Sequence, residues 1–233
     1  MSINKILDKD IEQIKRLIYE MIYETKLQYA STFEVVQTDD LELAQKTIAN
    51  DQKINDMLNA FTHIALWKIV KQRMVARDLR RTIGSISIAR EIEIIADYAK
   101  NICKYFVKYT PSKEDIEAIT VMFTMVIKML DLVSSLADSF GADQKNAVLE
   151  MEKELKSKFD EFNLGLFYKI RNAKTDEQAL VYFEQIRELK NLQRAADHLI
   201  NIQEILTFIR TGSFEELQNA AKVSEEDEDK EDL

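Results

Sequence analysis

Glycine, proline and cysteine are scarce in this chain of 233 residues, which has 4 Gly, 1 Pro and 1 Cys. Glycine supplies the positive-φ positions of tight β-turns and lets a backbone approach phosphate groups closely, so its scarcity argues against a β-rich fold. Neither GxGxxG nor GxxxxGKS/T occurs, which excludes the common glycine-rich nucleotide loops. The single cysteine, Cys103, excludes an internal disulfide and a cysteine-rich zinc site. The composition therefore predicts an all-α protein.

Acidic residues outnumber basic ones, 41 to 32. The formal net charge is −9, and the C-terminal run 225–232 alone holds seven acidic residues and one lysine. No basic patch stands out, so we expect no nucleic-acid binding. The most apolar segment, Ile116–Val133, is interrupted by Glu117, Lys128 and Asp131, so we expect no membrane span. The N-terminus lacks the pattern of a secretion signal, and a cytoplasmic protein is expected.

Six segments carry apolar residues at helical spacing. Five of them span about residues 3–33, 74–109, 111–140, 143–171 and 175–212, and the remaining one, second in the chain, begins at about residue 41. Asp39 with Glu42, and Thr175 with Gln178, have the spacing of capping boxes that open helices. Pro111 is suited to the first position of the fourth helix, and Gly212 to the end of the sixth.

The chain also contains an internal repeat. Residues 91–102 align with residues 191–202, and four of the twelve positions are identical. Both segments lie in the third helix of their half, and long helices joined by short loops form antiparallel bundles. We therefore predict six long antiparallel helices in a tandem pair of three-helix bundles, with residues 1–110 as the first and 111–212 as the second. An acidic, disordered tail is expected over 213–233.

Polar residues form a stripe in the first repeat. Glu93, Asp97 and Asn101 are spaced i, i+4, i+8, and Asp51 and Asn55 repeat the i, i+4 spacing on the second helix. Such a stripe either faces water or shares a cation, since carboxylate oxygens are ligands of hard and borderline metal ions. The spacing alone leaves both interpretations open.

The second repeat keeps part of this stripe. Asp197 and Asn201 correspond to Asp97 and Asn101, but Gln193 replaces the first acid, so a second cation site should be weaker or absent. Glu150 and Glu154 are the nearest acids with the spacing of the second-helix pair.

Catalytic patterns are missing. His63 and His198 are the only histidines, and neither belongs to the Glu-x-x-His pairs of di-iron bundles. No set of nucleophile and base can be assembled, so we expect a protein that is not an enzyme. A metal-binding bundle enzyme or metal store is the alternative from another functional class.

The stretch from Asp40 to Cys103 resembles the PhoU family of bacterial phosphate-signalling regulators. The matching elements are Ala44-Gln45-Lys46-Thr47-Ile48, Asp51-Gln52-Lys53-Ile54-Asn55, Arg77-Asp78-Leu79-Arg80 and Glu93-x-x-x-Asp97-Tyr98-Ala99-Lys100-Asn101-Ile102. The second half matches more loosely, at Arg194-Ala195-Ala196-Asp197-His198 and Asn201-Ile202. The family's usual Glu-Arg-Ile-Gly-Asp is changed here, because Ile94 and Ala96 replace the Arg and Gly.

The resemblance implies a PhoU-like fold and a regulator of phosphate uptake and phosphate-starvation signalling. Such a protein would bind the ATPase subunit of the phosphate ABC transporter at the inner face of the membrane, and a sensor histidine kinase where one exists. The alternative is an accessory subunit of a Pit-type phosphate permease. The resemblance also implies an iron or zinc ion on the acidic stripes, partner contacts at Asp78 and Arg80, and leaves a homodimer open.

Overall fold

The computed structural model describes residues 2–72, 74, 76–109, 111, 116–136 and 141–213, with side chains from residue 9 onward. All regular structure in these ranges is α-helical, in six helices that confirm the predicted fold class. They are α1 (Ser2–Thr38), α2 (Leu41–Gln72), α3 (Ala76–Tyr109), α4 (Glu117–Leu136), α5 (Ala142–Arg171) and α6 (Asp176–Thr211).

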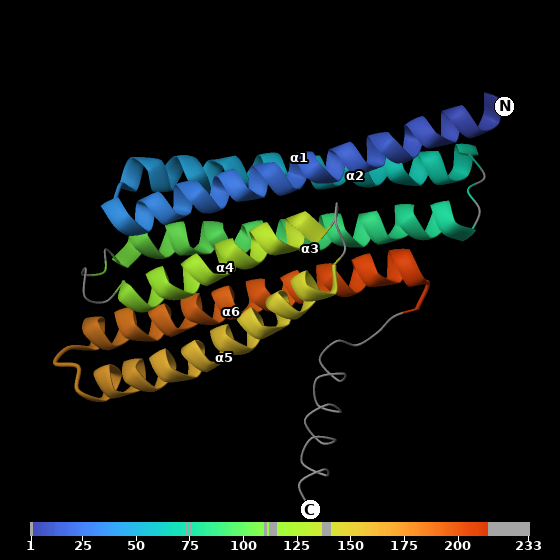
Figure 1. The fold of residues 1–233 in the computed structure, drawn as a ribbon. Coiled ribbons are helices and arrows are strands. Elements are labelled where there is room, and N and C mark those ends of the chain that lie inside the picture. The colour runs from blue at the N-terminus through green and yellow to red at the C-terminus, as the bar shows by residue number, and fades with distance from the viewer. Residues whose placement is uncertain are drawn as a thin grey trace, which may run out of the picture.

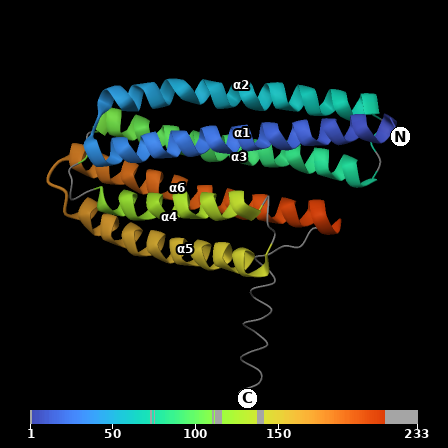
Figure 2. The same ribbon diagram turned by 45° about the horizontal axis from the view of Figure 1, so that its top comes forward.

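The helices lie nearly parallel or antiparallel along one long axis (Figures 1 and 2). Helices α1 and α2 pack on α3, and α4 and α5 pack on α6. The two groups meet mainly through α3 and α6, which run in opposite directions, with a smaller contact between α1 and α4. Because the α3–α6 contact is as extensive as the contacts inside each group, the division into two bundles at residue 110 stays a prediction.

Two predicted helix starts are wrong in detail. Asp40, not Asp39, opens α2: the Leu43 backbone N–H donates to Asp40 Oδ1 at 2.9 Å. Asp39 instead takes a φ of 57°, which lies outside the extended range of an N-cap residue. Pro111 lies outside the helices, and α4 begins only at Glu117.

The caps of α6 are confirmed. The Thr175 hydroxyl accepts from the Gln178 backbone N–H at 3.2 Å, although Gln178 Oε1 accepts from Lys174 rather than from Thr175. At the other end, Gly212 takes a φ of 88° and its N–H donates to the Phe208 carbonyl at 2.9 Å. The left-handed conformation costs glycine little, which is why the helix stops here. From residue 214 on, the predicted tail lies outside the described residues.

Helix α4 is the most apolar helix. Among the described residues it is the one helix that is long and apolar enough to cross a membrane. Half of its most apolar stretch is buried inside the protein. Met122, Phe123, Val126 and Met129 on its inner face have no exposed surface. A core helix passes the same test as a spanning helix, so this is weak evidence for a span.

Candidate functional site

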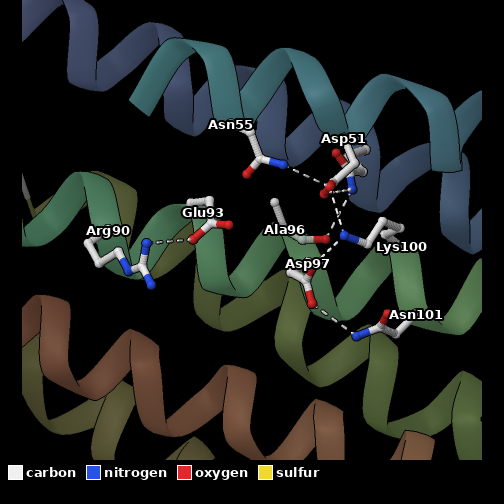
Figure 3. A network of polar contacts seen from close by, with 9 residues as sticks. Asp51, Asn55, Arg90, Glu93, Ala96, Asp97, Lys100 and Asn101 are labelled. Carbon is white, nitrogen blue, oxygen red and sulfur yellow. Dashed lines mark hydrogen bonds and ion pairs between the residues drawn. The ribbon is translucent and has the colours of Figure 1, made fainter. Parts of the chain in front are cut away.

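The first carboxylate cluster lies between α2 and α3, and Lys100 is at its centre (Figure 3). Lys100 Nζ is 2.8 Å from Asp51 Oδ2 on α2 and also forms an ion pair with Asp97 on α3. The side chains of Asp51 and Lys100 are 8% and 15% exposed, whereas that of Asp97 is 38% exposed. One ammonium group therefore neutralises two carboxylates that face each other across a helix interface.

Amides complete the coordination of both acids. Asn55 Nδ2 donates to Asp51 Oδ2 at 3.2 Å, and Asn101 Nδ2 donates to Asp97 Oδ2 at 3.0 Å. Gln28 on α1, which is buried, donates to Asp51 Oδ1 at 3.4 Å and to the Ala96 carbonyl at 3.0 Å. The cluster thus joins all three helices of the first half.

The charges on Lys100 and Glu93 are perturbed in ways that follow from this geometry. Burial by itself would lower the pKa of Lys100, but its hydrogen bonds to Asp51 and Asp97 outweigh burial and raise the pKa. Burial raises the pKa of Glu93, which has the more distant Arg90 as its ion-pair partner, at 3.7 Å. Glu93 therefore lies beside the Lys100 cluster without being held by Lys100.

The helical spacing of the acids explains their positions. Asp51 continues the buried stripe of α2 that includes Ala44, Thr47 and Ile54, so the helix carries its carboxylate inward. Asp97 follows the buried Ala96 on α3 and lies at the edge of the same interface. The sequence predicted these positions on a shared face, but it missed Lys100 as their common partner.

A second carboxylate cluster occupies the matching place in the other half. Lys156 on α5 forms ion pairs with Glu152, one turn away, and with Asp197 on α6, where the N–O distance is 3.6 Å. The side chains of Glu152 and Asp197 are 6% and 38% exposed, close to the 8% and 38% of Asp51 and Asp97. Burial would lower the pKa of Lys156, but the ion-pair partners Glu152 and Asp197 raise it overall.

The two clusters differ in which helix supplies the lysine. In the first cluster Lys100 comes from α3, and in the second Lys156 comes from α5, which corresponds to α2. Glu152, rather than Glu150 or Glu154, is the counterpart of Asp51. Glu152 continues the buried stripe of Val148, Leu155 and Phe159 on α5. This spacing is visible in the sequence and could have identified Glu152 as the inward-facing acid.

Asn201 does not join the second cluster. Its Nδ2 donates to Glu91 Oε2 on α3 at 3.1 Å, and His198 Nδ1 lies 2.7 Å from the same oxygen. His198 Nε2 is 3.4 Å from the hydroxyl of Tyr98, the residue one hundred positions earlier. Asn201 and His198 are thus part of the α3–α6 contact. Gln193 is nearby in sequence but accepts from Lys190 instead.

The two residues expected to bind a partner lie at the start of α3. Asp78 is in the first turn, where the helix dipole favours an acid. Arg80 donates from Nε to the Ile209 carbonyl near the end of α6 at 3.2 Å. Arg80 therefore has a structural contact, and the partner contact of both residues stays a prediction.

The first cluster as arranged does not fit a metal ion. Lys100 already lies between Asp51 and Asp97, and a cation there would have to displace a positive charge. Within the part of the chain that the structure describes, no group of three or more His, Cys, Asp or Glu side chains is placed to hold one ion. Metal binding at these residues stays a prediction that requires Lys100 to move.

The fold and the two clusters define a class: all-α proteins of two repeated three-helix groups that meet through their third helices. Residues 18–106 match the family model described as the PhoU domain. A protein of Zymomonas mobilis subsp. mobilis, named phosphate-specific transport system accessory protein PhoU homolog, is 29% identical over 212 residues. The alignment covers 89% of this chain and 88% of that protein.

Two crystal structures have the same fold. PhoU from Pseudomonas aeruginosa matches with a TM-score of 0.81 at 20% identity, covering 88% of this chain and 99% of the other. The phosphate transport system regulatory protein PhoU from Streptococcus pneumoniae matches with a TM-score of 0.76 at 17% identity, covering 91% and 100%. The chain therefore carries a match to the PhoU domain over residues 18–106 and is similar to PhoU proteins over most of its length. The predicted resemblance to PhoU is confirmed, and the names of these relatives agree with the predicted class of regulatory or accessory proteins.

Proposed function

We propose that this PhoU-like protein regulates phosphate uptake and damps the phosphate-starvation response by binding the cytoplasmic ATPase subunit of the phosphate ABC transporter. A sensor histidine kinase is the second partner where one is present. The observation that carries the proposal is similarity over almost the whole chain to a protein named as an accessory of phosphate-specific transport. In this role the protein is cytoplasmic and reaches the membrane only through the transporter.

Two exposed apolar patches support a partner-binding role. The first patch consists of Leu66, Trp67 and Val70 on α2 with Ile83 on α3. The second patch consists of Leu164, Phe167 and Tyr168 on α5 with Leu180 and Phe183 on α6. Every one of these residues is at least 47% exposed. Large exposed aromatic and aliphatic side chains are typical of protein–protein contact sites.

The two patches are at matching positions of the repeat. Ile83 and Phe183 are separated by the same interval as Tyr98 and His198, and both patches adjoin the connection between the last two helices of their half. Those connections lie at opposite ends of the molecule (Figure 1). A partner with two equivalent binding surfaces would contact both patches at once and gain from the linkage of two weak contacts.

A pull-down from native cells grown in high and in low phosphate tests the proposal. The bait is the tagged full chain, and mass spectrometry identifies the recovered proteins. Recovery of the transporter ATPase, reduced for the Phe167→Ser/Phe183→Ser variant, would support it. The matched control is Tyr23→Ser/Leu27→Ser, which removes two exposed apolar side chains from α1 away from both patches.

The same experiment separates the alternative. Recovery of a phosphate permease without the ATPase would favour an accessory subunit of a Pit-type carrier. Recovery of neither protein in either medium would contradict both functions.

Metal binding is a separate proposal that rests on the family resemblance. Iron or zinc would be held by the carboxylates of Glu93, Asp97 and Asp51, with Lys100 displaced. Elemental analysis of protein purified without chelator, repeated on Asp97→Ala, is the test. Equal metal content in both proteins would contradict a site at this cluster.

A further inference from the structure

A groove of about 820 Å³ lies between α1, α3, α6 and the last turns of α4. Its floor is apolar and isoleucine-rich. The floor residues include Ile14, Ile18, Ile88, Ile92, Leu206 and Ile209.

The groove follows from the unequal lengths of two helices. Helix α1 has 37 residues, whereas α4, which packs beside it, has 20. Leu130, Val133 and Ser134, near the end of α4, line one end of the groove. Beyond Leu136, α1 and α6 continue past the last turn of α4, and the groove lies along that stretch. Its apolar floor suits a further apolar segment of chain.

The rim of the groove is basic in a protein that is otherwise acidic. Among the described residues that line it, five are basic and Glu12 is the one acid. Three of the bases, Arg77, Arg80 and Arg81, are consecutive or nearly so at the start of α3. None of the ion pairs within the described ranges involves these three arginines.

The chain leaves α6 at the rim of this groove. A Cβ added at Gly212 would lie 2.7 Å from Arg80 Nη1, so the guanidinium is directly against the helix end. The left-handed conformation of Gly212 turns the chain away from the axis of α6. The chain therefore leaves the end of α6 beside Arg80, which is itself one of the residues that line the groove.

The sequence that follows is complementary to the groove. Phe214, Leu217 and Ala221 recur at the i, i+3, i+7 spacing of an apolar helix face, and the acidic run 225–232 comes next. Ten residues in a helix would extend about 15 Å. We propose that residues 214–223 dock in the groove as a helix, with Phe214 and Leu217 on its apolar floor, and that the acidic run pairs with Arg77 and Arg81 on its rim.

Limited proteolysis of the full chain tests this docking. Trypsin cleaves after Lys222 only when the surrounding residues are free to enter the protease, so the cleavage rate reports the undocked fraction. In the unmodified protein at low salt we expect slow cleavage at Lys222, measured by mass spectrometry. Arg77→Glu/Arg81→Glu should speed it by about tenfold, as should raising the salt to about 0.5 M, which screens the ion pairs.

Two further variants complete the design. Leu217→Glu leaves every described core residue unchanged and should also speed cleavage, so the test does not depend on the arginine variant folding. Arg171→Glu/Lys174→Glu makes the same change in net charge at the opposite end of the molecule and should leave the rate unchanged (Figure 1).

Equal cleavage rates in the unmodified protein, Leu217→Glu and Arg77→Glu/Arg81→Glu would overturn the proposal. Protection that disappears on dilution would place the segment in the groove of a second copy, and would overturn docking within one chain.

Discussion

Replacing Lys100 by methionine tests how much the first carboxylate cluster depends on its ammonium group. The substitution keeps most of the side-chain volume and leaves Asp51, which is 8% exposed, facing Asp97 without a cation between them. Removing one partner of a fully buried ion pair costs about 3–5 kcal/mol. Asn55 and Gln28 still donate to Asp51, and Asp97 is partly solvated, so we expect a loss of about 2–3 kcal/mol here.

Urea unfolding followed by far-UV circular dichroism measures this loss as a shift in midpoint at constant m-value. The double variant Asp51→Asn/Lys100→Met should lose less than Lys100→Met alone, because it leaves no buried charge unpaired. Lys46→Met, which removes the lysine of an exposed pair with Glu42, is the matched control and should not shift the midpoint. A Lys100→Met midpoint equal to that of Lys46→Met would refute the reasoning.

The pH dependence of the Lys100 contribution has a definite sign. The pKa of Lys100 is raised in the folded protein, so its stabilisation is fully present below the ordinary lysine pKa of 10.5. It is lost only as the pH rises through the folded-state value. The difference between Lys100→Met and the unmodified protein should therefore stay constant from pH 6 to about pH 9 and shrink in stronger alkali.

Two further predictions concern the buried residues Gly84 and Glu188. Gly84→Ala should destabilise the protein by about 1–2 kcal/mol, because the new Cβ would lie 2.5 Å from Ile209 Cγ1. Gly165→Ala is the control: its new Cβ would have nothing within 4 Å, so it should stabilise the protein by about 1 kcal/mol. Thermal unfolding measures both variants, and equal shifts in Tm would contradict the packing argument. Burial raises the pKa of Glu188, so stability falls as the pH rises above the ordinary value of 4.5. Glu188→Gln should therefore be more stable by about 1 kcal/mol at pH 7 and no more stable at pH 4, as urea titrations at both values would measure.

Local spacing predicted the features that depend on one helix. The i, i+4 spacing placed Asp51 with Asn55, and Asp97 with Asn101, on one face of each helix, and the structure joins each pair by a hydrogen bond. The end of α6 at Gly212 could also be predicted from local sequence, because helices commonly end at a glycine that follows the last apolar residues of the helical pattern.

Features that depend on two helices were not predictable in the same way. The bridge from Lys100 to Asp51 requires the register of α2 against α3, which no spacing within one helix specifies. The same limit explains why Asn201 pairs with Glu91 rather than with Asp197. Glu152 is different, since its place on an apolar stripe was visible, and the choice of Glu150 and Glu154 overlooked it.

The antiparallel pairing of α3 with α6 brings equivalent positions of the repeat together, as at Tyr98 and His198. A polypeptide with only one repeat could cover this surface only by pairing with another copy of itself, third helix against third helix, as a symmetric dimer. Joining two such units in one chain removes the dependence of that pairing on concentration. It also frees each unit to change separately, which the exchange of Glu93 for Gln193 illustrates.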